Sequence, residues 1–191
     1  MIRSQLLVLA LLFLPVLARA EWQTSKENGI RSLSYSATAP VLGKPTYFTV
    51  TFHSDTTETK VEHGVIGFDL TVKDVGRLAP FSFGDFEGPD ATTGGKKLLT
   101  VNVARKGQPA LTFAFSPSGS TPVEGSFTFE AIEVTSVPAS EPKTLLKALR
   151  DGSESLEIAI TDPRNAKLAL HFVVPVAGQE ARFRELLTGV K

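Results

Sequence analysis

Two neighbouring stretches decide the fold: PTYFTVTFH at residues 45–53 and IGFDLTVK at residues 66–73. In each stretch large apolar side chains take every second position, and the positions between them are polar or glycine. Successive side chains of a β-strand point to opposite faces, so both stretches predict strands with one buried and one solvated face. The Thr-rich solvated faces around Thr49, Thr51 and Thr71 are explained by the strand propensity of threonine.

The same alternation returns in the second half of the chain. It covers Leu99, Val101 and Val103; Leu111, Phe113 and Phe115; Leu156, Ile158 and Ile160; and Leu168, Leu170 and Phe172. Residues 106–109 separate the first two runs and residues 162–165 separate the last two. Both connections contain Gly, Pro, Asp or Asn, so we predict a hairpin turn at each.

The strand expected near Phe127 changes phase along its length. Phe127 and Phe129 share one face, whereas Ile132 and Val134 fall on the other. A β-bulge near residues 130–131 would return all four side chains to one face. A strand that is buried on both faces would also account for the pattern.

Two segments have helical spacing instead. Their apolar residues are Leu145, Leu146 and Leu149 in the first, and Phe183, Leu186, Leu187 and Val190 in the second. Pro142 stands in the first turn of one segment and Gly152 just past its end, as helix boundaries favour. Both helices are short and need a sheet to pack on. The pattern predicts a mainly β protein, an antiparallel β-sandwich or partly open barrel of about 8–9 strands with two short helices.

The first 20 residues have the organisation of a signal peptide. Arg3 precedes an aliphatic run, Leu6–Leu14, and Ala18-Arg19-Ala20 places small residues at the cleavage site. The run is about half as long as the roughly 20 apolar residues of a transmembrane helix. We therefore expect a signal peptide over residues 1–20, a single β-sandwich domain over residues 21–191, and no stable membrane insertion after cleavage.

Composition indicates where such a protein would act. The chain has no cysteine, although export usually permits disulfides. Asn28, Asn102 and Asn165 all lack the Ser or Thr two residues later that N-glycosylation requires. Both features favour a bacterial protein, periplasmic or secreted, over an exported eukaryotic one.

Several functions are disfavoured by the residues themselves. Lys and Arg number 20 and Asp and Glu number 20, without a basic stripe, so nucleic acid is not an expected partner. The chain has neither a G-x-S-x-G motif nor a cysteine nucleophile. His53 and His63 flank a polar loop at no standard zinc spacing, and we expect both to be exposed. We therefore predict no catalytic residue, no metal site and no cofactor.

The most distinctive segment is FSFGDFEGPD at residues 81–90. Its aromatic members are Phe81, Phe83 and Phe86, and its acidic members are Asp85, Glu87 and Asp90. The carboxylates around a glycine turn are of the kind that binds calcium, although the order of an EF-hand is absent. The rings are candidates for an exposed apolar binding surface. Alternatively, they plug one end of the sandwich while the acids stay solvated.

The last third of the chain, residues 144–190, resembles the invasion-associated locus B family of bacterial periplasmic proteins. The resemblance is carried by a short helix ending in Leu149-Arg150-Asp151-Gly152, two strands, and Pro175-Val176-Ala177-Gly178 before a final helix. Trp22 near the start of the mature chain also fits. The cysteines typical of that family are absent here. The resemblance implies a small exported β-sandwich without catalytic residues that is associated with the cell envelope.

Three functions remain open at this point. The first is an exported, non-enzymatic binding or envelope-associated module, whose partner is an unknown protein or envelope component. It predicts an exposed apolar or edge-strand surface. The second is a small-molecule or lipid carrier with a cavity between the sheets. The third is an acid-dependent envelope hydrolase acting through Asp85, Glu87 or Asp69, which requires a carboxyl with a raised pKa.

Overall fold

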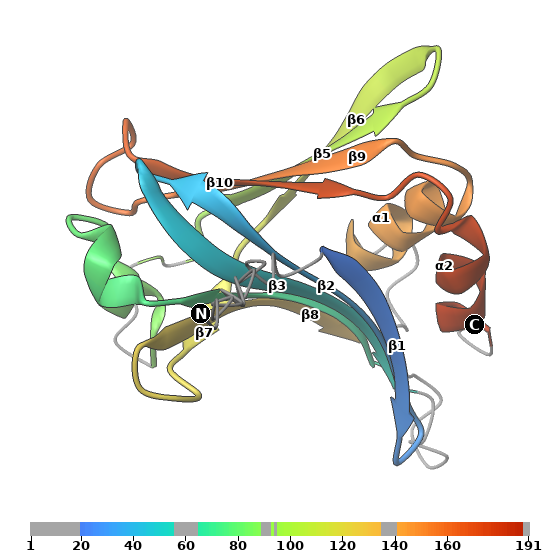
Figure 1. The fold of residues 1–191 in the computed structure, drawn as a ribbon, viewed down its shortest axis with the longest axis horizontal. Coiled ribbons are helices and arrows are strands. Elements are labelled where there is room, and N and C mark those ends of the chain that lie inside the picture. Colours follow the sequence, from blue (N-terminus) through green and yellow to red (C-terminus); the bar gives the residue numbers. More distant parts are fainter. Residues whose placement is uncertain (1–19, 56–64, 89–92, 94, 135–140, 189–191) are drawn as a thin grey trace, which may run out of the picture.

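Two antiparallel sheets face each other in the computed structural model, which describes residues 20–55, 65–88, 93, 95–134 and 141–188 (Figure 1). One sheet has six strands in the order β1-β2-β3-β4-β8-β7, and the other has four in the order β10-β9-β5-β6. The expected mainly β, antiparallel sandwich is therefore confirmed. The described residues form ten strands instead of eight or nine, because the sequence pattern missed short or polar strands such as β1 and β7.

The six-stranded sheet contains both stretches that decide the fold. Its strands are β1 (Glu21–Glu27), β2 (Ile30–Val41), β3 (Lys44–Asp55), β4 (Val65–Lys73), β7 (Ser118–Ser120) and β8 (Ser126–Val134). Val50 of β3 lies opposite Leu70 of β4, so the buried faces of the two strands coincide. The β2–β3 turn consists of Leu42 and Gly43, with φ angles of 48° and 73°. Two-residue hairpin turns of this kind require positive φ at both positions, which glycine adopts without strain.

The four-stranded sheet consists of the hairpins that the sequence predicts. Its strands are β5 (Leu99–Arg105), β6 (Gln108–Phe115), β9 (Ser155–Thr161) and β10 (Ala169–Pro175). β5 pairs with β6 around Lys106 and Gly107, and β9 pairs with β10 around residues 162–168. Both predicted hairpins are therefore confirmed.

The bulge expected in β8 is not formed. β4 and β8 pair without a register shift, from Val65 opposite Val134 to Lys73 opposite Ser126. Thr128, like Ser126, is buried although it faces away from the core rings, so this part of β8 is buried on both faces. A strand with two buried faces needs no bulge to keep its apolar side chains from water.

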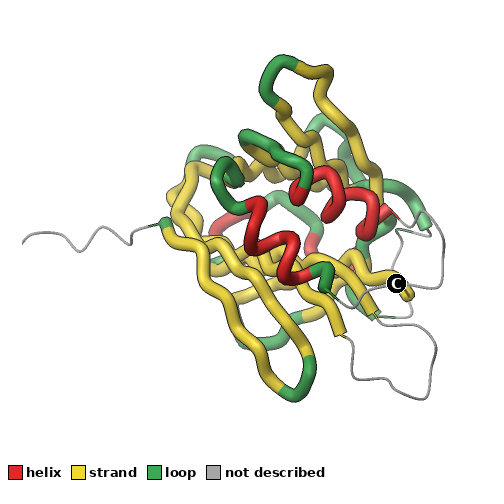
Figure 2. The backbone as a smooth tube through the Cα atoms, turned by 90° about the vertical axis from the view of Figure 1, so that its right-hand side faces the viewer, coloured by secondary structure: helices red, strands yellow, loops and turns green. Residues whose placement is uncertain are grey.

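Helices close one end of the sandwich and short turns close the other. α1 (Glu141–Arg150) and α2 (Glu180–Leu186) lie side by side at one end (Figure 2). Two 3-10 turns, η1 (Val75–Leu78) and η2 (Phe83–Phe86), lie at the opposite end (Figure 1). Most of the apolar residues that predicted the helices are buried in the core: Leu145, Leu146, Leu149, Phe183 and Leu186. Leu187 directly follows α2 and is partly buried, and Val190 lies outside the described residues. None of the described helices combines the length and the apolar character that crossing a membrane demands.

Trp22 joins β1 to the rest of the core. Its ring stacks at 6.3 Å from Phe52 and meets Phe183 of α2 edge-on at 5.8 Å. Its indole Nε1 donates a hydrogen bond of 2.9 Å to the carbonyl oxygen of Pro175 at the end of β10. One side chain thus connects both sheets and α2. The predicted signal peptide lies almost wholly outside the described residues and stays a prediction.

Replacing Phe183 by alanine should lower the free energy of unfolding by about 3–5 kcal/mol, because a fully buried ring leaves a cavity. Urea denaturation of a protein comprising residues 21–191 measures this change. Arg184→Ala on the exposed side of the same helix is the control, with an expected change within about 0.5 kcal/mol. Equal effects of the two substitutions would show that α2 is not docked through Phe183.

Candidate functional site

The distinctive segment at residues 81–88 lies at the end of the sandwich that carries η1 and η2. Phe81 is 6% exposed and Phe86 is 1% exposed, whereas Phe83 is partly exposed. Phe86 meets Phe129 of β8 edge-on, with ring centroids 5.0 Å apart. Phe81 and Phe86 therefore belong to the core and are not available to a ligand at the surface. Asp90 lies outside the described residues.

Asp85 is held by an ion pair and is not solvated. The guanidinium of Arg164, in the β9–β10 turn, donates to both carboxylate oxygens of Asp85 at 2.5 Å. This bidentate hydrogen bonding holds the pKa of Asp85 below its ordinary value of 3.8. The buried carboxylate of Asp162 adds a second link, since its Oδ2 accepts a hydrogen bond of 2.6 Å from the backbone N–H of Ser82. We call this pair of links the end clasp.

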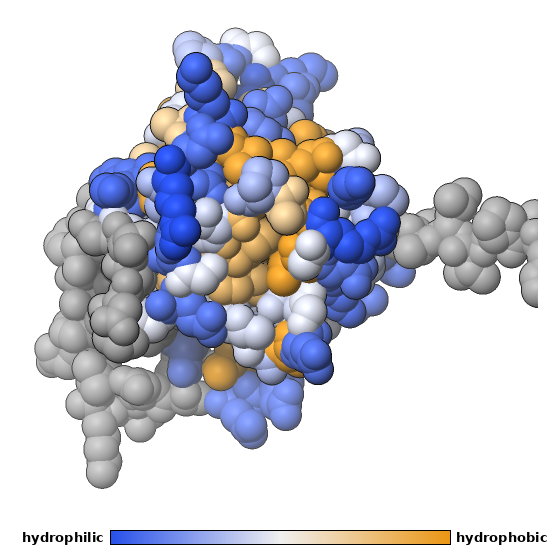
Figure 3. Space-filling view, turned by 90° about the vertical axis from the view of Figure 1, so that its left-hand side faces the viewer, coloured by the Kyte–Doolittle hydropathy of each residue, from blue (hydrophilic) through white to orange (hydrophobic). Residues whose placement is uncertain are grey.

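Glu87 remains at the surface. Its carboxylate accepts hydrogen bonds from the backbone N–H and the hydroxyl of Thr121, at 3.2 and 3.3 Å. An apolar area bordered by hydrophilic side chains is visible at this end of the molecule (Figure 3). Leu42 at the β2–β3 turn is 36% exposed, and Phe83 is partly exposed. A binding role of residues 81–88 stays a prediction, and it rests on Phe83 and Glu87 more than on the buried rings.

A larger polar surface covers the outer face of the six-stranded sheet. Its residues alternate with core residues along four strands, and the pairing of these strands aligns them in two rows. The rows are Ser36, Thr49, Thr71 and Thr128, and Ser34, Thr51, Asp69 and Glu130. We call these two rows, together with His53, the hydroxyl face. It is an array of polar groups aligned across four strands, and Thr128 at its β8 edge is buried.

Hydrogen bonds between strands order the hydroxyl groups. Ser34 bonds Thr51 at 3.0 Å, and Ser36 bonds Thr49 at 2.9 Å. Thr71 and Thr128 are bonded at 2.9 Å in the same way. A hydroxyl group offers one donor and two acceptor sites, so each pair keeps capacity for a ligand or for water.

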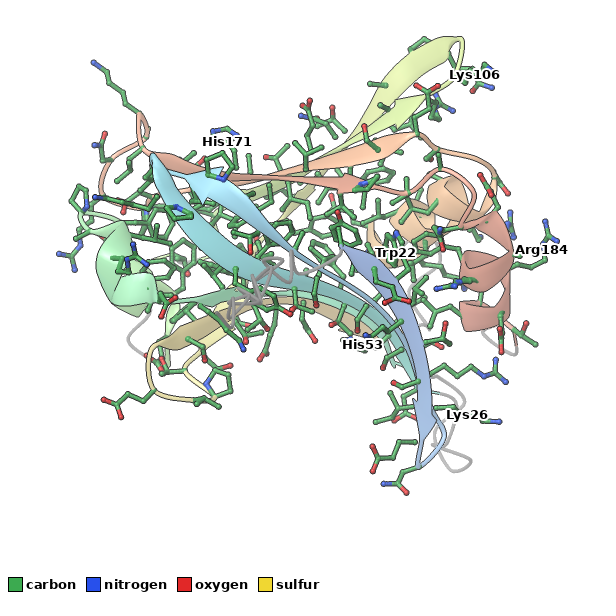
Figure 4. All side chains as sticks on the ribbon, in the orientation of Figure 1. Trp22, Lys26, His53, Lys106, His171 and Arg184 are labelled. Carbon is green, nitrogen blue, oxygen red and sulfur yellow. The ribbon has the colours of Figure 1, made fainter. Side chains whose placement is uncertain are left out.

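Asp69 lies in the second row and is the one acidic side chain of the hydroxyl face that approaches a histidine in the described residues. Its Oδ2 lies 3.5 Å from Nδ1 of His53, which points away from the four-stranded sheet (Figure 4). Its Oδ1 is buried and accepts no hydrogen bond within the described part of the chain. A buried acceptor without a partner costs about 1–3 kcal/mol. Asp69 therefore places a carboxylate in the middle of the hydroxyl face, with its side chain 27% exposed and only its Oδ1 buried.

One end of the hydroxyl face opens into a hollow of about 320 Å³. Thr71 and Lys73 of β4 and Val123 of the β7–β8 turn are among its lining residues. Val123 is 68% exposed, and the ammonium of Lys73 lies 5.0 Å from the ring centroid of Tyr47. This end thus combines an aromatic ring, a cation and an apolar side chain next to the hydroxyl rows.

Metal ligands do not gather in the described ranges. No group of three His, Asp or Glu residues there is close enough to hold a metal ion. His53 approaches Asp69, and His63 lies outside the described residues. His171 is exposed on the outer face of the four-stranded sheet, as its alternation with Leu170 and Phe172 indicates (Figure 4).

The sequence predicts that Thr49, Thr51 and Thr71 are solvated, but it does not predict that they form one surface with residues of β2 and β8. Period-two alternation shows which side chains of one strand share a side, and strand propensity accounts for their type. Neither shows that β4 lies between β3 and β8, which is what places Asp69 between Thr51 and Glu130.

In comparisons with known proteins, no family model, no curated protein and no solved structure matches this chain.

Asp85→Asn should destabilise the protein only where the carboxylate is ionised. A carboxyl whose pKa is lowered by folding adds stability above its unfolded pKa, and this stability is lost as the pH falls through the folded pKa. The variant should therefore be less stable than the wild type at about pH 6, and the difference should shrink below about pH 4. Urea denaturation across this range measures it. Glu87→Gln is the control on the same segment, and a loss for Asp85→Asn that is equal at all pH values would contradict the role of the ion pair.

Proposed function

We propose that the protein is an exported, non-enzymatic binding module whose hydroxyl face binds an extended carbohydrate of the cell envelope. The observation that carries the proposal is the alignment of two polar rows across four strands, with the partly exposed carboxylate of Asp69 in the middle of one of them. Hydroxyl and carboxylate groups on a rigid sheet are pre-organised, so little conformational entropy is lost when they bind.

The chemistry of the face matches a polyhydroxylated ligand. Each sugar hydroxyl donates one hydrogen bond and accepts others, as the Ser and Thr side chains of the rows do. Asp69 adds a charged acceptor, and hydrogen bonds to charged groups contribute about 1.5–3 kcal/mol. The hydroxyl face carries two acidic side chains, Asp69 and Glu130, and one cation, Lys73, at the end beside the hollow. Because an acidic polymer would be repelled by the carboxylates, this charge favours a neutral or amino-sugar polymer as the ligand.

The shape of the sheet supports an extended ligand. The six-stranded sheet curves toward the hydroxyl face, with the β1–β2 turn projecting at one end and the β7–β8 turn at the other (Figure 1). A polymer lying across the strands would pass from Ser34 through Thr51 to Asp69. The hollow beside Lys73 would take the end of such a chain or a branch from it.

The two other functions gain less support from the geometry. Aromatic rings from both sheets touch in the interior, for example Phe48 and Phe172 at 4.9 Å, where a carrier would hold its ligand. A hydrolase acting through Asp85 would need a raised pKa at that carboxyl, whereas Arg164 lowers it. The resemblance to the invasion-associated locus B family agrees with an envelope-associated module and stays a prediction.

The proposal is tested with an array of neutral and amino-sugar oligosaccharides, followed by calorimetric titration of those that bind. Asp69→Asn should weaken binding about tenfold or more, because it removes the charged acceptor. Thr51→Val should weaken binding about threefold to tenfold, since it removes one hydroxyl of nearly the same volume.

Thr100→Val is the matched control, because Thr100 is partly buried on the four-stranded sheet, away from the hydroxyl face. It should leave binding unchanged. Thermal unfolding of all three variants checks that the sheet is intact. Absence of binding to every oligosaccharide, or equal effects of Thr51→Val and Thr100→Val, would overturn the proposal.

A further inference from the structure

The β5–β6 hairpin extends beyond the sandwich as an arm, defined here as residues 104–110 (Figure 1). Lys106 marks its tip (Figure 4), and residues 106–110 are all exposed. The arm lies above α1 when the molecule is viewed from the end that the helices close (Figure 2). β6 is an edge strand, with Pro109 near its start and a register shift between Val103 and Arg105, both of which oppose pairing with a further strand.

Two open hollows lie under the arm. One, of about 300 Å³, lies between the arm and α1, and the other, of about 460 Å³, lies between the arm, the α1–β9 turn and the start of α2. Arg105, Gln108, Asp151 and Gly152 line both hollows, so the hollows adjoin. Together they form what we call the arm groove. Each is within the range of small-ligand sites, about 300–1,000 Å³.

Charge is distributed unequally along the arm groove. The hollow against α1 has two basic residues and one acidic residue, with Lys147 added to the shared Arg105 and Asp151. The other hollow has three acidic residues and two basic ones, with Glu154 and Glu180 among them. One end of the groove is therefore net positive and the other is net negative.

Several of these charges are fixed in place. Nε and Nη2 of Arg105 both donate to the carbonyl oxygen of Pro109, at 3.1 and 2.7 Å. Oδ1 of Asp151 accepts a hydrogen bond of 2.7 Å from Arg150, which holds the pKa of Asp151 below its ordinary value and keeps it ionised near neutral pH. Oε1 of Glu180 accepts a hydrogen bond of 3.3 Å from the backbone N–H of Gly178. Fixed charges bind a ligand with less loss of side-chain entropy.

We propose that the arm groove binds a short peptide with free termini, its carboxylate toward Lys147 and Arg105 and its ammonium toward Glu154 and Glu180. A zwitterionic chain has the opposite charge at each end, in the order that the groove requires. A peptide of a few residues spans about 3.3–3.6 Å per residue, so its two termini can reach different hollows. Leu111 and Ala148 offer apolar surface for a small side chain in the hollow against α1. This site is separate from the hydroxyl face and does not depend on its role.

The probe is trialanine, titrated into isotope-labelled mature protein and followed by the amide signals in heteronuclear NMR. We expect saturable shifts in the arm and in α1. Trialanine with an amidated C-terminus and trialanine with an acetylated N-terminus should each bind about tenfold or more weakly, because each loses one charge-assisted contact. Equal binding of the capped and free peptides, or no saturable binding at all, would overturn the proposal.

Substitutions in the arm groove test which residue binds which terminus of the peptide. Lys147→Gln should weaken the binding of free trialanine. It should have little further effect on the amidated peptide, because that peptide already lacks the carboxylate that Lys147 is proposed to bind. Glu154→Gln should do the same for the acetylated peptide. Lys167→Gln in the β9–β10 turn and Glu124→Gln in the β7–β8 turn are exposed controls of the same charge types, and they should change nothing. If the controls weaken binding as much as the groove variants, the effect is one of overall charge and the assigned site is wrong.

Discussion

Phe48 of the six-stranded sheet and Phe172 of the four-stranded sheet meet with their ring centroids 4.9 Å apart, and Phe68 meets Phe115 across the same interior at 5.2 Å. These contacts between the sheets fix which face of β3, β4, β6 and β10 is turned inward. Because side chains alternate along a strand, the inward placement of one set commits the intervening set to the outside. The order of the hydroxyl face is thus a consequence of aromatic packing on the other side of the same strands. A change of register by one residue would bury the hydroxyl rows and expose the rings.

The two ends of the sandwich are closed by different kinds of interaction. At one end α1 and α2 bury leucines and Phe183, and Trp22 joins this end to both sheets. At the other end the plug of rings around Phe86 is held by the end clasp, in which Arg164 and Asp162 bind a segment about eighty residues earlier. The first closure depends on apolar burial, whereas the second depends on ionised carboxylates and therefore on pH.

The two proposed sites differ in how they are built. The hydroxyl face lies on strands in the middle of a sheet, where pairing on both sides fixes each side chain. The arm groove lies between a projecting hairpin and two helices, so its width depends on how the arm sits above α1. The first suits an extended ligand of repeated hydroxyl groups, and the second suits a short ligand with charged ends.

The sequence by itself determined the strands at residues 45–53 and 66–73, the two hairpins of the four-stranded sheet, and the helices that bury Leu145 and Phe183. It did so because period and turn chemistry are local properties. Tertiary structure alone decided that Asp69 lies between Thr51 and Glu130, that Asp85 is paired with Arg164, and that the arm stands opposite α1. Alternation along a strand specifies on which face a side chain lies, but not which residue of the next strand lies beside it. That neighbour depends on which strands pair, and pairing is set by the burial of apolar side chains from strands far apart in the chain.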